Sequence, residues 1–120
     1  MKTGSILKSK DNYPLVTSIV ICYKKFDYLY EAISSILNQD YPFIQLIISD
    51  DASGNFPESE IREYIEKNKK KNIIETKIIV NEKNLGTVRN LNNAQKAGSG
   101  EYYIGLSGDD VFYNNNTMDF

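Results

Sequence analysis

Short apolar runs rich in β-branched residues recur along this 120-residue chain, with helical patterns between them. In the run at residues 16–22 nearly every position is apolar, which is typical of a strand whose two faces are both covered, whereas the run at 73–80 partly alternates. We expect four such strands, over residues 16–22, 44–49, 73–80 and 102–106. Each of them is followed by polar residues, which predicts a loop at the end of every strand.

Three stretches between the expected strands predict helices. The first carries an apolar stripe with the spacing i, i+3, i+4, i+7, i+8, made by Leu29, Ala32, Ile33, Ile36 and Leu37. The second follows Pro57, a residue that the first helical turn tolerates. The third, over residues 87–97, contains several asparagines, which are poor helix formers. Its expected buried residues are Val88, Leu91, Ala94 and Ala97.

The alternation of strands and helices predicts the class of fold. It is typical of an α/β fold with a parallel sheet, right-handed crossovers and helices on both faces. Residues 1–14 are mostly polar and precede the pattern, so we expect a polar leader there. Residues 15–120 then form one domain or part of one, which their length permits.

Composition and charge exclude several classes of chemistry. The chain has no histidine, so Ser-His-Asp and Cys-His catalysis and the usual zinc sites are excluded. A net charge of −2 gives no basic field that would favour nucleic acid as a partner. The single cysteine, Cys22, allows no internal disulfide and fits a reducing compartment. No apolar run approaches the roughly 20 residues that a membrane-spanning helix needs, so we expect a cytoplasmic protein.

Candidate chemistry lies at the ends of three expected strands. Cys22-Tyr23 follows the first, Asp50-Asp51 the second and Asp109-Asp110 the fourth. Parallel sheets bind ligands at the carboxyl ends of their strands, so we expect these groups to converge. Carboxylates there can accept hydrogen bonds from a base or a sugar, or hold a divalent cation shared with a diphosphate. The alternative interpretation of Asp109-Asp110 is a turn that caps the next segment.

The sequence lacks both common glycine-rich phosphate loops, G-x-G-x-x-G and G-x-x-x-x-G-K. The charge of a bound diphosphate would therefore have to be met by a metal ion or by lysine and arginine side chains. Together the strand-end groups predict a nucleotide-diphosphate site of that kind.

Four segments, in order, resemble the family 2 glycosyltransferases. They are AISSILNQDYP at residues 32–42, IISDDAS at 47–53, NLG followed by RN at 84–90, and GEYY leading into SGDD at 100–110. The resemblance covers about residues 15–120. It implies a GT-A fold, with a Rossmann-like sheet, and transfer of a sugar from a nucleotide-diphosphate donor with inversion at the anomeric carbon. It also implies a saccharide or lipid-linked acceptor. The expected donor is a UDP-sugar, and uridine, guanosine and thymidine all stay open as its base.

The resemblance also implies roles for residues at the base of the donor. Tyr23 and Asp51 would contact the base, with Asp50 and Cys22 beside them, and Arg89 would lie near the base. The family commonly has Pro-Thr-Tyr-Asn after the first strand, and this chain is one residue shorter there.

At the diphosphate, the resemblance places Asp109 against the ribose and phosphates, and Asp110 with Asp109 on a Mn²⁺ or Mg²⁺ ion. Ser107 stands where the family's acidic motif often begins with Asp. The family's acceptor half, with its catalytic base, normally lies beyond this point. We therefore assign no catalytic residue, and expect a truncated, donor-binding half that is inactive alone. It should self-associate through apolar residues near its end, namely Phe112, Met118 and Phe120.

Three alternatives remain. A phosphoreceiver-like signalling domain has this length and alternation, but it needs an acidic pair after the first strand. A nucleotidyltransferase of similar fold usually opens with a glycine-rich segment that this chain lacks. A non-catalytic nucleotide- or sugar-binding module fits the same strand ends.

Overall fold

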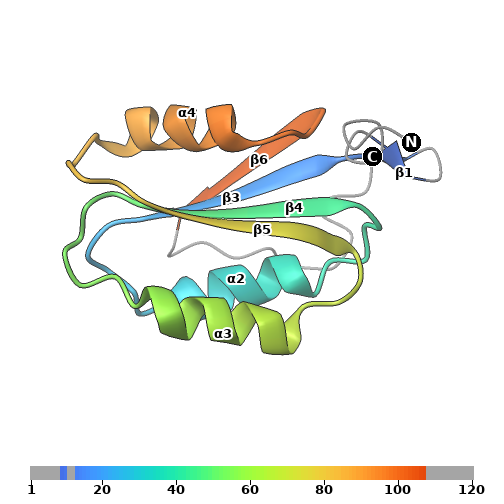
Figure 1. Ribbon diagram of the computed structural model, residues 1–120, viewed down its shortest axis with the longest axis horizontal. Coiled ribbons are helices and arrows are strands. Elements are labelled where there is room, and N and C mark those ends of the chain that lie inside the picture. Colours follow the sequence, from blue (N-terminus) through green and yellow to red (C-terminus); the bar gives the residue numbers. More distant parts are fainter. Residues whose placement is uncertain (1–8, 11–12, 108–120) are drawn as a thin grey trace.

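The computed structural model describes residues 9–10 and 13–107 and is built around a parallel sheet of four strands (Figure 1). The strands are β3 (Val16–Cys22), β4 (Ile44–Asp50), β5 (Ile73–Val80) and β6 (Tyr102–Ser107). They lie in the order β5-β4-β3-β6, and every neighbouring pair is parallel. The predicted parallel α/β sheet is confirmed, with β4 and β6 each extending one residue beyond the expected end.

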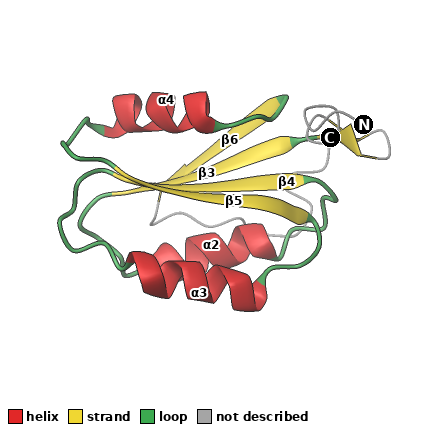
Figure 2. Ribbon diagram, viewed as in Figure 1, coloured by secondary structure: helices red, strands yellow, loops and turns green. Residues whose placement is uncertain are grey.

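Helices cover both faces of the sheet, as predicted. α2 (Leu29–Leu37) and α3 (Glu58–Asn68) lie on one face, and α4 (Thr87–Ala97) lies on the other (Figure 2). The prediction that Val88 is buried is wrong, because its side chain is 70% exposed. Asn90 is buried instead, so the inner face of α4 includes a polar residue.

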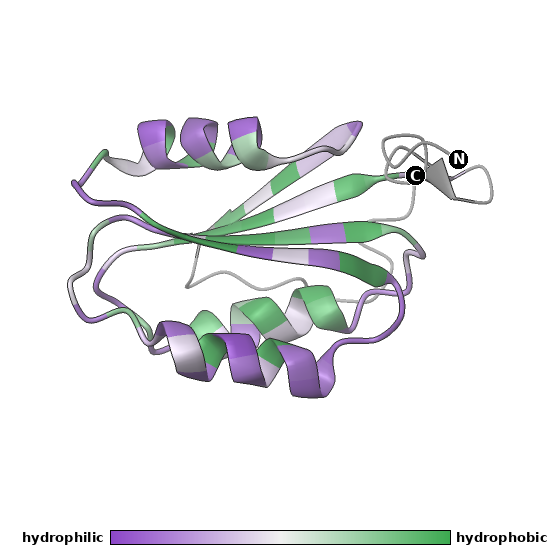
Figure 3. Ribbon diagram, viewed as in Figure 1, coloured by the Kyte–Doolittle hydropathy of each residue, from purple (hydrophilic) through white to green (hydrophobic). Residues whose placement is uncertain are grey.

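The two faces of the sheet bury very different amounts of apolar surface. Beneath α2 and α3 lies a large buried cluster that includes Leu46 and Ile61. Beneath α4 the fully buried apolar residues are Ile19, Ile47 and Ala94. Figure 3 shows α4 as largely hydrophilic. Because its apolar contact is small, polar contacts must do more to hold α4 on the sheet.

The connection after α4 is fixed to the sheet by such polar contacts. The backbone N–H groups of Ser99 and Gly100 donate to Gln45 Oε1 and Thr17 Oγ1, each at 2.9 Å. The Thr17 hydroxyl in turn donates to Gln45 Oε1 at 2.8 Å. A Cβ atom on Gly100 would lie 2.4 Å from Thr17 Oγ1, so this close approach requires glycine.

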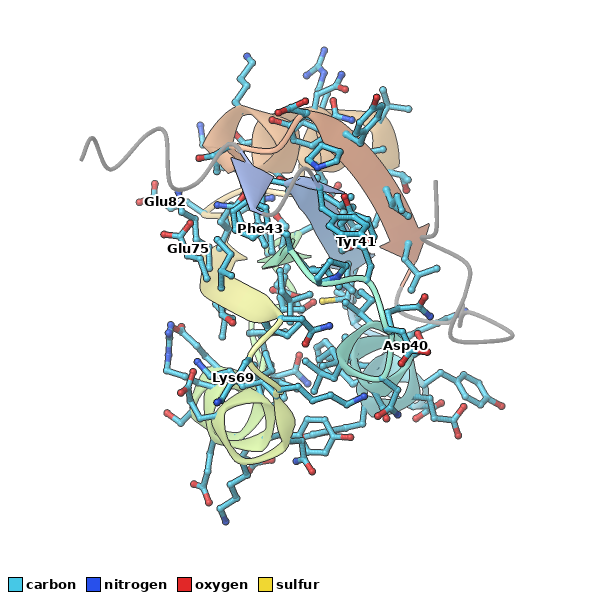
Figure 4. All side chains as sticks on the ribbon, turned by 90° about the vertical axis from the view of Figure 1, so that its right-hand side faces the viewer. Asp40, Tyr41, Phe43, Lys69, Glu75 and Glu82 are labelled. Carbon is cyan, nitrogen blue, oxygen red and sulfur yellow. The ribbon has the colours of Figure 1, made fainter. Side chains whose placement is uncertain are left out.

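A short antiparallel pair, β1 (Ser9–Lys10) and β2 (Tyr13–Pro14), precedes the sheet. The Tyr41 hydroxyl donates a hydrogen bond to the carbonyl of Pro14, and Tyr41 is buried. Figure 4 views the edge at which the strands begin, with Tyr41 and Phe43 in the connection that leads into β4. The end of the expected leader therefore contacts the domain.

The acidic pair Asp109-Asp110 lies outside the described residues, as do the residues expected to cause self-association, namely Phe112, Met118 and Phe120. Both expectations stay predictions. Within the part of the chain that the structure describes, no helix is both long and apolar enough to cross a membrane.

Candidate functional site

The strands end at one edge of the sheet, on the left of Figure 1. Cys22 at the end of β3 pairs in register with Asp50 at the end of β4, and Asp50 pairs with Val80 at the end of β5. On the other side of β3, Ser107 of β6 pairs with Ile21. The predicted convergence of the first two strand ends is confirmed. The loop after β5 joins them, and sequence reasoning did not include that loop in the site.

Asp50 closes β4 and is fully buried. Its carboxylate accepts hydrogen bonds from the backbone N–H of Ser53 at 3.0 Å and from the Ser53 hydroxyl. It also accepts a hydrogen bond from the Cys22 thiol, with 3.6 Å between Sγ and Oδ1. Burial raises the pKa of the Cys22 thiol, and the neighbouring charge of Asp50 raises it further. Cys22 therefore stays protonated and serves packing rather than nucleophilic chemistry.

Asp51 holds the loop after β5, residues 81–86. The backbone N–H of Leu85 donates to Asp51 Oδ1 at 2.8 Å and that of Gly86 donates to Oδ2 at 2.9 Å. The side chain of Asn81 adds a third hydrogen bond, to Oδ1 at 3.1 Å. These donors stabilise a carboxylate that is only 3% exposed.

Asp51 also lies at the start of α4. Gly86 is the N-cap residue of that helix, with φ +85°, and it has no side chain to cap the helix. Asp51 accepts the N–H of this N-cap residue itself and places a negative charge near the positive end of the helix dipole. Its partners are therefore loop and helix, and its predicted contact with the base stays a prediction.

A buried amide below this loop was missed by sequence reasoning. Asn90 is 2% exposed, and its Oδ1 accepts hydrogen bonds from Ser49 Oγ at 2.6 Å and from Asn81 Nδ2 at 2.9 Å. Its Nδ2 donates to the carbonyl of Ser49 at 3.2 Å. One signal existed in the sequence: Asn90 lies one helical turn before Ala94, on the face expected to be buried.

The remaining candidates are exposed. Tyr23 follows β3 and is 43% exposed, and Lys24 Nζ lies over its ring, 5.1 Å from the centroid. Lys24 has a left-handed backbone with φ +61°, and its N–H donates to Ser53 Oγ at 2.7 Å. Arg89 is exposed on α4, one residue before the buried Asn90. The structure brings Tyr23 to the carboxyl edge, as predicted.

Neither a cluster of metal ligands among the described residues nor the depression with the larger volume described below adds to this site. Among the described residues, no group of three or more Cys, Asp or Glu side chains is arranged to hold a metal ion. A depression of about 490 Å³ lies at the opposite edge of the sheet. It is lined by Gln39, Asp40, Pro42, Lys70, Lys71 and Asn72. Because ligands of parallel sheets bind at the carboxyl ends of strands, we assign the site to the edge around Asp51.

Comparison with known families matches this chain to the model described as glycosyl transferase family 2, over residues 17–117. The chain belongs to glycosyl transferase family 2. The match runs from the second residue of β3 through β6 and includes all three helices. The predicted family is confirmed.

Relatives in this family include two described as uncharacterized glycosyltransferases. One, from Haemophilus influenzae, is 36% identical over 101 residues, which are 84% of this chain and 30% of the relative. The other, from Methanocaldococcus jannaschii, is 37% identical over 102 residues, which are 82% of this chain and 33% of the relative. The chain thus spans about a third of the length of the curated relatives it matches.

Solved structures confirm the predicted GT-A fold. A mannosyltransferase from Pyrobaculum calidifontis, in complex with GDP-Man and Mn²⁺, matches with a TM-score of 0.75 and 24% identity. The match covers 86% of this chain and 30% of that one. Residues 1–349 of S. aureus TarS, in complex with UDP-GlcNAc, match with a TM-score of 0.68 and 27% identity, over 86% of this chain and 28% of that one.

Proposed function

We propose that this family 2 glycosyltransferase chain binds the nucleotide-diphosphate part of a UDP-sugar at the carboxyl edge of its sheet. In the whole protein, the sugar is transferred with inversion to a saccharide or lipid-linked acceptor, a hexosyltransferase reaction at the cytoplasmic side. The observation that carries the proposal is the convergence of the loops after β3, β4 and β5 around the buried carboxylates of Asp50 and Asp51. The nucleotide sugars bound by similar structures support it.

The base of the nucleotide lies between the loops in this proposal. Tyr23 offers an exposed ring for stacking. Among the described residues Asp51 Oδ2 accepts one hydrogen bond, from the N–H of Gly86, which leaves a lone pair for the edge of the base. Arg89, exposed in the first turn of α4, is proposed to lie near the base. Cys22 and Asp50 are buried beneath the proposed site. The hydrogen bond between them and the bonds from Ser53 to Asp50 fix the loop after β4.

The diphosphate requires positive charge, and two sources are proposed. Asp109 and Asp110 follow Ser107, the last residue of β6, by two and three residues in the sequence, and β6 ends beside β3 at the carboxyl edge. Their paired carboxylates suit Mn²⁺ or Mg²⁺, which prefer oxygen ligands. Such an ion, when bound, neutralises charge on the leaving diphosphate. The ammonium of Lys24, held beside Tyr23, is the second source.

The acceptor and the catalytic base belong to the rest of the protein in this proposal. Curated relatives are about three times as long as the aligned region, so regions outside this chain have room to supply both. We therefore expect nucleotide binding without transfer when the chain is tested alone.

Calorimetric titration of the 120-residue chain with UDP, GDP and ADP, each with and without Mn²⁺, tests the proposal. We expect UDP to bind most tightly and Mn²⁺ to strengthen its binding. Equal affinity for all three nucleotides, or no binding at millimolar concentrations, contradicts the proposed function.

A further inference from the structure

We propose that Asn90 is a positioning residue of the donor site, a proposal that rests on the function proposed above. Its buried amide links the end of β4 to the loop after β5, residues 81–86. That link fixes the loop around Asp51, and with it the direction in which the Asp51 carboxylate faces.

The side chain of Asn90 holds the first end of this loop. Its Oδ1 accepts a hydrogen bond from Nδ2 of Asn81, at the first loop residue, at 2.9 Å. At the last loop residue, Gly86, the backbone N–H of Asn90 makes the ordinary i→i−4 helix bond at 2.8 Å, which does not depend on its side chain. Between these points, Asp51 accepts the N–H groups of Leu85 and Gly86. One buried residue of α4 and one carboxylate of the β4 loop therefore fix the loop together.

The orientation of the Asn90 amide is itself determined. Ser49 Oγ and Asn81 Nδ2 both donate to Oδ1, and Nδ2 donates to the carbonyl of Ser49. A flipped amide would set its NH₂ group against the NH₂ group of Asn81 and leave the Ser49 carbonyl without that donor. The side chain thus acts as a fixed connector between two strand ends.

Asn90 acts on a ligand only through its partners, because it is 2% exposed. Its loss would leave the Ser49 carbonyl and the Asn81 amide without these buried partners. The apolar contact of α4, made by Ile19, Ile47 and Ala94, would stay in place. The expected consequence is therefore a loosened loop on an intact fold.

The first arm of the test needs no nucleotide. Asn90→Ala is compared with Asn92→Ala, the same change at an exposed position of the same helix. NMR measures hydrogen exchange of the Leu85 and Gly86 amides, whose acceptor is Asp51. We expect exchange at least tenfold faster in Asn90→Ala, parent-like exchange in Asn92→Ala, and unchanged exchange at Ile36 in α2. Equal exchange rates at Leu85 and Gly86 in Asn90→Ala and Asn92→Ala overturn the proposal. If Asn90→Ala does not fold, Ser49→Ala removes one of the hydrogen bonds that fix the Asn90 amide, leaves the donors of Asp51 in place, and must show the same selective loss.

The second arm measures UDP affinity with Mn²⁺. We expect Asn90→Ala to bind UDP about tenfold more weakly than the parent, and Asn92→Ala to match the parent. In Asn90→Asp, a protonated carboxyl group can again donate to the Ser49 carbonyl, whereas a carboxylate cannot. Its UDP affinity relative to the parent should therefore recover as the pH falls from 8 to 5.5, which a general loss of stability would not produce.

The two arms separate the two proposals. Faster exchange at Leu85 and Gly86 with unchanged UDP affinity overturns the role of Asn90 in the donor site. Failure of the parent chain to bind UDP, GDP or ADP contradicts the proposed function, and the donor role of Asn90 falls with it. The exchange arm then still decides whether Asn90 fixes the loop.

Discussion

The thiol of Cys22 donates a hydrogen bond to the carboxylate of Asp50 across the ends of β3 and β4, with 3.6 Å between Sγ and Oδ1. Both side chains are buried, and they form the floor of the carboxyl edge. Burial and the Asp50 charge both raise the pKa of the thiol, so folding favours its protonated form.

This raised pKa predicts how stability depends on pH. The contribution of the protonated thiol is fully present below the pKa of an unfolded cysteine, about 8.5, and is lost as the pH rises above it. Relative to Cys22→Ala, the free energy of unfolding of the parent should fall by up to about 1.4 kcal/mol for each pH unit above that point. Urea unfolding of both proteins between pH 7 and 10 measures this. If the difference in free energy of unfolding between the parent and Cys22→Ala stays constant from pH 7 to 10, the raised pKa of Cys22 is contradicted.

Gly100 packs against the backbone and side chain of Thr17. A Cβ atom there would lie 2.8 Å from the Thr17 backbone nitrogen, which cannot move without disturbing β3. Gly100→Ala should therefore lower the free energy of unfolding by on the order of 1–3 kcal/mol, the usual cost of overpacking. Ser99→Ala, at the exposed neighbouring position, is the control and should change it by less than about 0.5 kcal/mol. Equal free energies of unfolding for the two variants would contradict this, because they would show that the segment between α4 and β6 accommodates a Cβ atom at Gly100.

The acidic pair after β6 predicts a metal-dependent effect. If Asp110 is a metal ligand, Asp110→Asn should weaken UDP binding by on the order of 1–3 kcal/mol in the presence of Mn²⁺. Without metal, the variant and the parent should bind UDP alike. Calorimetry with and without Mn²⁺ makes the comparison, and an equal loss in both conditions removes Asp110 from the metal site.

The architecture could be predicted from the sequence because its signals are local. β3 and β4 are rich in isoleucine and buried along almost their whole length, and α2 has a regular stripe whose five apolar members are all buried. The prediction was wrong at Val88, where apolar character suggested burial in a helix with few apolar residues. Asn90 took the inner position because Ser49 and Asn81 satisfy its amide there, and such partners are distant in sequence.

The location of the candidate site could be predicted from the sequence, but the hydrogen bonds within it could not. Sequence reasoning put Asp50 and Asp51 at the carboxyl edge, since paired acids after a buried strand mark that edge. It could not show that Asp51 binds the backbone of Leu85 and Gly86, 34 and 35 residues away. Those hydrogen bonds depend on how closely the loop after β5 approaches β4, which local patterns do not encode.

The central claim is that nucleotide binds at the carboxyl edge of the sheet, and NMR titration of the chain with UDP and Mg²⁺ tests it most directly. Amide shifts should change at Tyr23, Asp51 and Leu85, which surround the proposed site. They should not change at Gln39 and Asn72, which line the depression at the opposite edge. Shift changes confined to Gln39 and Asn72, or no shift changes at millimolar UDP, would contradict the account.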